Sequence, residues 1–473
     1  MAGTTTVAPS TRRAHARKPK KIGADYVPAE PWTLRAALQQ GDIFTRLSAL
    51  IWGLSNVVRK QYVKAVLFFA IEIAAIAFII VGAIPSLAQL PGLGTGKVEK
   101  VKDADGFWQT IVPTPSVVLL LYGVSSLVMI VLIAWFWTVM MRSQYKAQYL
   151  ASTQGHAPTF KEDCEDLLSG RLWLTLMTLP TLGIFTFTVL PLIFMISMAF
   201  TSYDAKHPTK FDWVGLQNFG QLFSTTGSTV NFAIFTEVLI WTLVWAFFAT
   251  FLNFFLGMFL AMVIERPTTR LKGMWRAIFS MSIAVPQFVS LLVMRQMLQQ
   301  NGAINRLFMQ WGWIDQPLPF FTDPTWARVT VIIINLWVGI PFTIMQITGI
   351  LENIPGELTE AATLDGANWW QRFTNVTMPY IIFVMTPYLI TTFTANVNNF
   401  NVIYLLSGGD PTPVGSSAGK TDLLITWLYK LTVDKNNYNI GAVIGIFTFI
   451  VLAVVSLITY RSSGSYKNEE AFR

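Results

Sequence analysis

The sequence predicts an all-α, polytopic membrane protein with about eight transmembrane helices. Of its 473 residues, 53% are hydrophobic and only 13% are charged, whereas a soluble protein carries about 25% charged residues. The apolar residues form runs that reach the roughly 20 residues a helix needs to cross a bilayer. The predicted spans cover residues 65–84, 117–141, 172–200, 233–264, 277–298, 327–350, 379–405 and 440–460.

Residues 1–64 precede the first span and are predicted to be cytoplasmic. No apolar run follows the basic stretch Arg12–Lys21, so we expect a solvated tail rather than a signal peptide. Contact of this tail with anionic lipids is an alternative, and nucleic acid is not an expected partner. Residues 43–64 place apolar residues near helical spacing with basic residues between them. This pattern fits an amphipathic helix at the membrane interface and an ordinary soluble helix equally well.

The distribution of lysine and arginine predicts the orientation in the membrane. An even number of spans puts both termini on one side. With the N-terminus in the cytoplasm, the cytoplasmic segments hold 23 of the 34 Lys and Arg residues and the outer loops hold 9. Cytoplasmic loops collect these cations, so we expect both termini inside, and residues 351–378 then face the cytoplasm.

Two charged residues within the predicted spans are candidates for a function. Glu72 lies in the first span near the cations of residues 59–64, and we expect a paired structural charge there, with a proton-coupling carboxylate as the alternative. Arg295 lies near the outer end of the fifth span, where its long side chain can reach the interface. Prolines inside spans free backbone carbonyls and permit kinks. They are Pro180, Pro191, Pro286 and Pro341.

No group of residues predicts an enzyme. Cys164 is the only cysteine, so an intrachain disulfide and a thiolate metal cluster are both excluded. The loop Gly408–Asp422 contains AGKT, which is similar to the end of a phosphate-binding loop, but Val414 stands where that pattern requires glycine. We therefore expect no catalytic activity, bound nucleotide, cofactor or metal in this chain.

A polar, helix-favouring stretch, Glu360–Pro379, lies between the sixth and seventh spans. Glu357 and Glu360 complement the positive start of a helix, and Gly366 can end that helix in the left-handed conformation. A second short helix can then follow. The stretch fits a two-helix knob in the cytoplasm or a loop that only connects two spans.

The pattern EAA, three residues, Gly and later a hydrophobic residue with Pro resembles the EAA loop of ABC importer membrane subunits. Over about residues 172–473 the chain is similar to the MalF family, the permease subunits of maltose/maltodextrin importers. The strings that carry the similarity are AVPQFVSLLV (284–293), FTDPTWAR (321–328), NLWVGIPF (335–342), NVNNF (396–400) and LLSGGDPT (405–412).

The resemblance implies three parts: the cytoplasmic region 1–64, two additional transmembrane helices in 65–171, and a permease core of the type I importer fold in 172–473, with the EAA loop at 351–378. It implies a non-catalytic permease subunit in a bacterial cytoplasmic membrane. The implied partners are a second, MalG-like permease, a MalK-like ATPase dimer that binds ATP and Mg²⁺, an extracellular sugar-binding protein, and an oligosaccharide as cargo.

For the EAA loop, the resemblance implies docking into a cleft of the ATPase, with Glu360 as the charged contact. Asp365 and Gly366 would shape the turn. The coupling residues it assigns are Glu360, Ala361, Ala362, Asp365, Gly366, Ala367 and Pro379.

For the sugar, the resemblance implies a site on the two spans that flank the EAA loop. The residues it assigns are Val338, Gly339, Phe342, Thr392, Ala395, Asn396 and Asn399. Asparagine amides donate and accept hydrogen bonds to hydroxyls, Phe342 offers a flat face to a sugar ring, and Gly339 lets the backbone approach. Phe342 replaces the family's Tyr and Ala395 replaces an aromatic residue, which points to a longer or different oligosaccharide.

One loop departs from the family pattern. The outer loop after the third span has only about 30 residues, where Gram-negative relatives carry a large domain. A short loop fits a bacterium with one membrane and a lipid-anchored binding protein. Two other functions stay open: a secondary sugar transporter, which should show internal repeats and intramembrane acid pairs, and a membrane scaffold or receptor.

Overall fold

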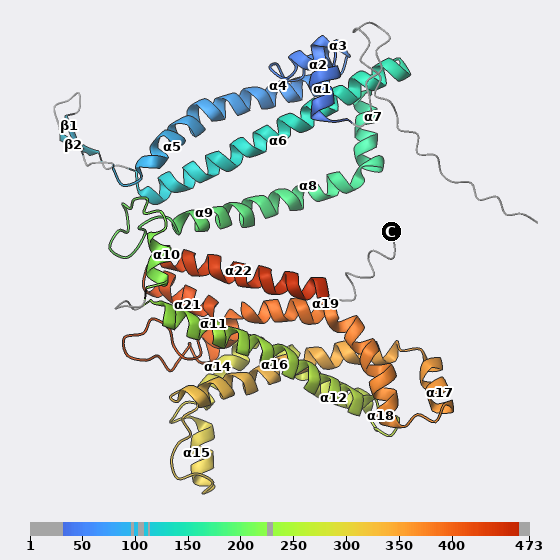
Figure 1. Cartoon of the computed structure of the whole chain (residues 1–473), viewed down its shortest axis with the longest axis vertical. Coiled ribbons are helices and arrows are strands. Elements are labelled where there is room, and N and C mark those ends of the chain that lie inside the picture. The colour runs from blue at the N-terminus through green and yellow to red at the C-terminus, as the bar shows by residue number, and fades with distance from the viewer. Residues whose placement is uncertain (1–31, 96–98, 103–107, 112–113, 225–229, 463–473) are drawn as a thin grey trace, which may run out of the picture. The chain divides into compact units, whose positions relative to one another are not determined.

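The computed structural model describes residues 32–95, 99–102, 108–111, 114–224 and 230–462 (Figure 1). Contacts divide the chain into two compact units, residues 1–194 and 195–473. The basic tail Arg12–Lys21 lies outside the described residues. The predicted division at residues 64 and 171 stays a prediction. In the division by contacts, the third span belongs to the first unit as far as residue 194.

The described part of the first unit is helical apart from one β-hairpin. Two of its long membrane helices, the one formed by α4, η1 and α5 and the 39-residue α6, pack against each other. Its elements are α1 (Leu34–Gln40), α2 (Ile43–Leu47), α3 (Leu54–Val58), α4 (Tyr62–Ala77), η1 (Phe78–Ala83), α5 (Ile84–Gln89), η2 (Leu90–Gly92), β1 (Glu99–Lys102), β2 (Trp108–Ile111), α6 (Ser116–Gln154), α7 (Phe160–Glu165), η3 (Asp166–Gly170), α8 (Leu172–Ile184), η4 (Phe185–Val189) and α9 (Leu190–Met198), which crosses the boundary.

The segment before the first span folds into short helices, so the prediction of one amphipathic helix over residues 43–64 is wrong. Asp42 caps α2 by accepting a 2.7 Å hydrogen bond from the Thr45 amide. Its other carboxylate oxygen lies 2.6 Å from Arg59 Nη2, in an ion pair whose arginine is 8% exposed. Gly53 adopts φ +86° beside Ala65, where a Cβ would lie 2.8 Å from the Ala65 oxygen. The chain therefore turns sharply there instead of continuing as one helix.

Glu72 stabilises this same turn. Its side chain is 7% exposed and accepts a 2.9 Å hydrogen bond from the Trp52 backbone amide. Within the described residues no ion pair reaches it, so the expected pairing with a nearby cation is wrong. The carboxylate satisfies a buried backbone donor, which would otherwise cost about 1–3 kcal/mol.

The described part of the second unit contains only helices, turns and an isolated bridge. Its elements are α10 (Gln217–Leu222), α11 (Phe232–Phe247), η5 (Phe248–Leu252), α12 (Asn253–Glu265), α13 (Lys272–Ala284), α14 (Gln287–Met297), α15 (Ala303–Gln310), α16 (Pro324–Glu352), α17 (Gly356–Leu364), α18 (Trp369–Arg372), η6 (Phe373–Thr377), α19 (Met378–Val397), α20 (Phe400–Leu406), α21 (Leu424–Tyr429), η7 (Lys430–Asp434) and α22 (Tyr438–Ser462).

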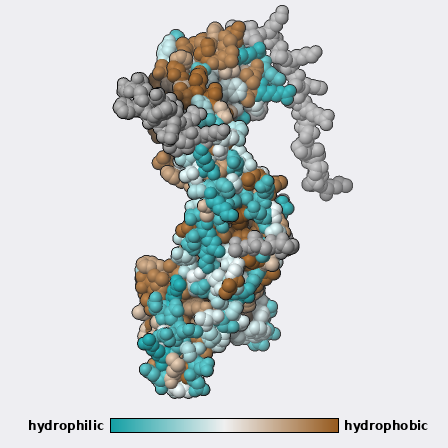
Figure 2. All heavy atoms as spheres, turned by 90° about the vertical axis from the view of Figure 1, so that its left-hand side faces the viewer, coloured by the Kyte–Doolittle hydropathy of each residue, from teal (hydrophilic) through white to brown (hydrophobic). Residues whose placement is uncertain are grey.

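Among the described residues, seven helices are long and apolar enough to cross a membrane, or eight if a bent pair counts as one span. This confirms the predicted class. Many large apolar side chains on these helices are exposed, and hydrophobic patches are visible on the surface in Figure 2. In a bilayer such side chains face lipid rather than water.

Two predicted spans differ in shape from the expectation. The fifth is not one straight helix, because α13 and α14 meet at an angle of 85°. Pro286 lies at this break, where it cannot donate a helical hydrogen bond. The seventh was expected to run to residue 405, but α19 ends at Val397 and α20 is a separate helix. Both breaks lie beside the candidate site.

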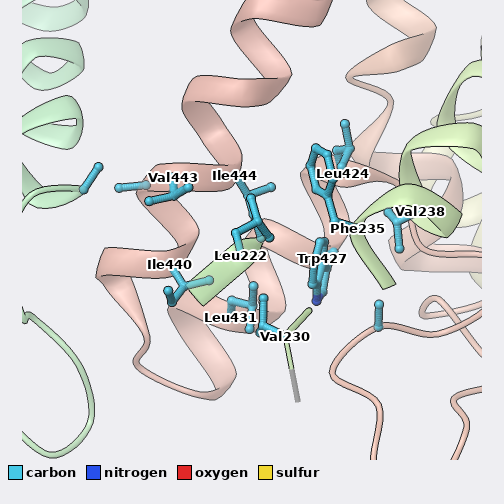
Figure 3. Close-up of a cluster of buried hydrophobic side chains, with 13 residues drawn as sticks. Leu222, Val230, Phe235, Val238, Leu424, Trp427, Leu431, Ile440, Val443 and Ile444 are labelled. Atoms are coloured by element: carbon cyan, nitrogen blue, oxygen red, sulfur yellow. The ribbon is translucent and has the colours of Figure 1, made fainter. Parts of the chain in front are cut away.

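The largest buried cluster of the second unit joins α10, α11, α21 and α22 (Figure 3). Trp427 lies at its centre, and its indole N–H donates a 3.0 Å hydrogen bond to Ser417 Oγ. The side chains labelled in the figure are Leu222, Val230, Phe235, Val238, Leu424, Trp427, Leu431, Ile440, Val443 and Ile444. This packing holds the loop before α21 against the helices.

That loop also contains a buried ion pair. Asp422 is fully buried, and its Oδ2 lies 2.7 Å from Lys430 Nζ. The same oxygen accepts a 2.7 Å hydrogen bond from the Gly419 amide, and Oδ1 accepts one from Thr426 Oγ1. Burial raises the pKa of the Asp422 carboxyl, and the Lys430 ammonium opposes that shift.

Replacing Lys430 with methionine should destabilise the protein by about 3 kcal/mol, because it leaves a buried carboxylate without its cation. Thermal unfolding of the purified protein in detergent would measure the effect. Lys435→Met is the matched control, since Lys435 is exposed and no ion pair reaches it in the described residues. Equal unfolding temperatures for the two variants would contradict the prediction.

Candidate functional site

A cavity of about 150 Å³ lies among α12, α14, α16 and α19. We call it the amide cavity, because asparagine and glutamine side chains supply much of its polar lining. Its lining residues are Ala249, Thr250, Asn253, Phe254, Gln287, Asn335, Val338, Gly339, Phe342, Thr343, Tyr388, Leu389, Thr392, Asn396 and Asn399. Six of the seven residues predicted for sugar binding are among them.

Ala395 is the predicted residue that does not line the amide cavity. It lies on α19 and is exposed. Phe342 lines the cavity and is still 47% exposed. These two positions therefore have surface free for a further partner or for cargo.

The break between α19 and α20 brings two asparagine amides to the cavity. Asn399 caps α20 by accepting a 3.2 Å hydrogen bond from the Val402 amide. Asn396 Nδ2 donates to Thr250 Oγ1 at 3.0 Å, and Asn399 Nδ2 donates to Asn396 Oδ1 at 3.3 Å. Each amide has more donor and acceptor capacity than these bonds use. The side chains thus both join helices and keep polar capacity for a ligand.

The position of Gly339 has no room for a larger side chain, because a neighbouring helix fills the space. A Cβ on Gly339 would lie 2.4 Å from Asn253 Nδ2, so the missing side chain makes room for this amide. Asn253 Nδ2 donates to the Ala249 carbonyl at 2.6 Å, but Asn253 Oδ1 is buried and no described protein group donates to it. An unsatisfied buried acceptor costs about 1–3 kcal/mol, so a donor such as a hydroxyl would be stabilised here.

Three lining amides were missed by sequence reasoning. Asn253 lies in an apolar run, Asn335 is 4% exposed on α16, and Gln287 is the first residue of α14 after the 85° bend. The signal was present, since uncharged amides inside spans are costly in lipid unless they face a cavity or a partner. Of the three, Gln287 reaches the cavity directly after the bend at Pro286.

The EAA loop forms two helical segments, as predicted. Helix α17 ends at Leu364, and Gly366 follows with φ +78°. The Ala367 amide donates to the Ala362 carbonyl at 3.0 Å and the Gly366 amide donates to the Thr363 carbonyl at 3.1 Å. These two bonds form a Schellman motif, which requires the left-handed residue that glycine supplies.

The second segment begins with a capping box. Asn368 Oδ1 accepts from the Gln371 amide at 2.8 Å, and Gln371 Oε1 accepts from the Asn368 amide at 2.8 Å. Arg372 Nη1 donates to Thr363 Oγ1 at 2.9 Å, which ties α18 to α17. Helices α17 and α18 thus form a helical hairpin, which we call the EAA hairpin, and local hydrogen bonds fix its shape.

The surface of this hairpin is open. Glu360, Ala361 and Asp365 are exposed, and within the described residues no ion pair reaches either acid. Leu364 is 89% exposed and Trp370 is 60% exposed. Sequence reasoning missed these two, although exposed apolar residues in a polar loop are typical of a docking surface.

An ionic network lies at the base of the EAA loop. Arg276 on α13 contacts Glu265 Oε1 at 2.7 Å and Glu352 Oε1 at 2.6 Å. These acids are the last residues of α12 and α16. The Arg276 guanidinium thus joins α13 to the C-terminal ends of α12 and α16. Arg266 lies 5.6 Å from the ring centre of Trp369 on α18.

Comparisons with known proteins agree with this architecture. Residues 253–464 match the family described as "Binding-protein-dependent transport system inner membrane component". The chain is 32% identical over 434 residues to the galactooligosaccharides transport system permease protein GanP of Bacillus subtilis, covering 89% of this chain and 98% of that one.

Other relatives are similar over different lengths. The maltodextrin transport system permease protein MalC of Streptococcus pneumoniae is 32% identical over 439 residues, covering 90% of this chain and 96% of MalC. The maltose/maltodextrin permease protein MalF of Vibrio parahaemolyticus is 31% identical over 254 residues, which is 52% of this chain and 48% of MalF.

Among solved structures, a bacterial ABC transporter involved in alginate import has the same fold over part of the chain. The similarity has a TM-score of 0.52 at 23% identity, and it covers 63% of this chain and 96% of the other.

Proposed function

Because this chain belongs to the permease subunits of binding-protein-dependent ABC importers, we propose that it forms one half of a path for oligosaccharides of the maltodextrin type. The amide cavity is the place where the sugar binds, and the EAA loop is the place where the ATPase docks. The chain itself catalyses no covalent step.

The amide cavity carries the proposal. Amides from α12, α14, α16 and α19 converge on it, and one acceptor, Asn253 Oδ1, has no protein donor among the described residues. Hydroxyl-rich cargo can accept from the Asn396 and Asn399 amides, and a hydroxyl or water that reaches the buried Asn253 Oδ1 would satisfy this acceptor. No charged side chain is among the lining residues, which suits a neutral sugar better than an acidic one.

The size of the cavity indicates a shared site. Its volume of about 150 Å³ is below the roughly 300–1,000 Å³ of ordinary ligand pockets. A second permease would supply the remaining wall, and the exposed Phe342 and Ala395 are the residues that would face it or the cargo. This also fits the absence of an aromatic side chain at residue 395.

Coupling to ATP requires a part of the chain that contacts the ATPase differently in two states. The EAA hairpin suits this role, because its shape is held by its own hydrogen bonds while its apolar and acidic side chains are exposed. The partner ATPase dimer would bind ATP and Mg²⁺. Its closure would move the hairpin, and the Arg276 network would carry the movement to α12, α13 and α16.

The remaining partners follow from the family. Its members are inner membrane components of systems that depend on a binding protein, so this chain lies in the cytoplasmic membrane. We infer an extracellular sugar-binding protein, a MalG-like second permease, and both termini in the cytoplasm. GanP and MalC are each 32% identical to this chain, and their names refer to different sugars, galactooligosaccharides and maltodextrins. The transport experiment below therefore compares the two sugar classes.

Reconstitution tests the proposal. Proteoliposomes that contain this chain, its partner permease and the ATPase should take up maltotriose or longer maltodextrins only with the binding protein outside and ATP with Mg²⁺ inside. Galactooligosaccharides as the better substrate would refute the maltodextrin assignment. Uptake driven by a proton or sodium gradient without ATP would refute the ABC mechanism and indicate a secondary transporter. An assembled complex with no transport would favour a scaffold.

A further inference from the structure

A second cavity, unrelated to the sugar path, lies within the first unit. Its volume is about 620 Å³, and its walls come from the start of α4, the last turns of α6, α7, η3 and the residue before α8. Figure 1 shows α7 between the ends of α6 and α8. We call it the basic pocket, after its four cations, Lys64, Arg142, Lys146 and Arg171.

The pocket lies at a membrane boundary. Lys64 is at the start of the first span, Arg142 follows the apolar part of α6, and Arg171 directly precedes the apolar helix α8. At 39 residues, α6 is much longer than the roughly 20 residues that cross a bilayer, so its last turns leave the membrane. The cations therefore lie at the depth of lipid headgroups, on the side where Lys and Arg accumulate.

The carboxylates of the pocket do not pair closely with all of its cations. Asp163 lies 2.8 Å from Lys64, and Asp166 forms its close ion pair with Arg171. Lys146 Nζ is 3.9 Å from the same Asp166 oxygen, beyond hydrogen-bond distance. Arg142 is exposed, and no ion pair reaches it within the described residues.

The third carboxylate is also occupied. Glu162 caps α7 by accepting 2.6 Å and 3.1 Å hydrogen bonds from the Thr159 amide and hydroxyl. The three acids are thus committed to the fold, and Arg142 and Lys146 remain to bind an anion.

The surroundings favour a lipid over a soluble anion. Trp32 and Val139 line the pocket, and Leu172 and Trp173, 42% and 65% exposed, follow Arg171 on α8. Tryptophan is typical of the interface between headgroups and hydrocarbon. An anion with acyl chains could place its phosphate on the cations and its chains along α8, whereas free phosphate would use the polar half only.

We propose that the basic pocket binds the phosphate of an anionic phospholipid through Arg142 and Lys146. The site is separate from the sugar path and does not depend on the proposed transport function. It would anchor the first unit to membranes that contain anionic lipid.

Native mass spectrometry of the full-length protein in detergent, titrated with phosphatidylglycerol, tests the proposal. Each cation near the surface of an anionic membrane contributes about 1 kcal/mol, so Arg142→Ala with Lys146→Ala should weaken binding of the tightest lipid by about 25-fold. Lys161→Ala is the matched control, because Lys161 lies on α7, is 86% exposed and does not line the pocket. Arg142→Lys should retain most of the affinity.

Three results would overturn the proposal. The first is phosphatidylcholine binding as tightly as phosphatidylglycerol, and the second is the double variant binding phosphatidylglycerol like the wild type. The third is inorganic phosphate displacing the bound lipid as effectively as glycerophosphate or added phosphatidylglycerol does. The last result would identify a free-anion site. Unchanged thermal unfolding of the double variant without lipid shows that any loss of binding is not a loss of fold.

Discussion

Replacing Asn396 and Asn399 with alanine is expected to reduce sugar uptake strongly while the complex still assembles. The two amides lie at the break between α19 and α20, on the wall of the amide cavity. Each lost hydrogen bond to a sugar hydroxyl costs about 1–3 kcal/mol when its partner stays buried and unpaired. The double variant should therefore lose at least about tenfold in uptake of labelled maltodextrin, measured at a sugar concentration below saturation.

The two side chains also support the fold, so the controls must separate these roles. Asn399→Ser keeps an oxygen that can cap α20, but it removes the amide donor; uptake should still fall. Thr250→Val removes the acceptor of the Asn396 Nδ2 donor and leaves the amide itself in place. Asn398→Ala is the matched control, since Asn398 is exposed and does not line the cavity. If the double variant transports normally, the sugar does not bind here.

Replacing Leu364 with aspartate should separate the permease from its ATPase. Leu364 is 89% exposed at the tip of the EAA hairpin, so its replacement costs the fold little. An apolar anchor at the centre of an interface contributes about 2 kcal/mol or more, which is about thirtyfold in affinity. Co-purification of the ATPase, and ATP hydrolysis stimulated by the loaded binding protein, should both fall.

Thr359→Asp is the matched control for this experiment. It adds the same charge to the same helix, about 140° around the axis from Leu364, and Thr359 is also exposed. Gly366→Val tests the hairpin shape independently, because a β-branched residue at φ +78° disfavours the Schellman motif. It should uncouple transport even though it leaves Leu364 unchanged. Normal ATPase binding by both Leu364→Asp and Gly366→Val would show that the loop only connects two spans.

The two sets of variants should affect different measurements. Loss of the sugar site should leave ATPase docking intact, and loss of docking should leave sugar binding intact in the purified permeases. A variant set in which both readouts always fall together would indicate misfolding rather than either role. The lipid experiment is independent of both, because it measures binding to the first unit.

Much of this architecture could be predicted from the order of residues. Eight apolar runs, separated by polar loops, determine where helices cross a bilayer, because each unpaired backbone group in lipid is costly. Gly366 indicated the end of α17, because glycine is the residue that most readily takes the left-handed conformation at a helix end. Each of these signals is local, and the number of spans and the helix end at Gly366 agree with the structure when the bent pair α13 and α14 counts as one span.

Other features depend on contacts between residues far apart in the chain. Asn253, Gln287 and Asn396 line one cavity although they lie on three different helices, and Gln287 follows the 85° bend between α13 and α14, an angle that hydropathy alone does not encode. Gly339 lines the amide cavity as predicted for a sugar site, and the structure adds that the Asn253 amide lies where its Cβ would be. Glu72 looked like half of an ion pair, whereas it accepts a hydrogen bond from the Trp52 amide.

The physical reason for this division is the range of the forces. Transfer to lipid and helix capping act on consecutive residues, so they can be read along the sequence and indicate the class of protein, its spans and the helix end at Gly366. A cavity exists only where side chains from separate helices leave space, and an orphan acceptor such as Asn253 Oδ1 becomes visible only when every neighbour is in place. The packed helices alone decide which amides meet in that space.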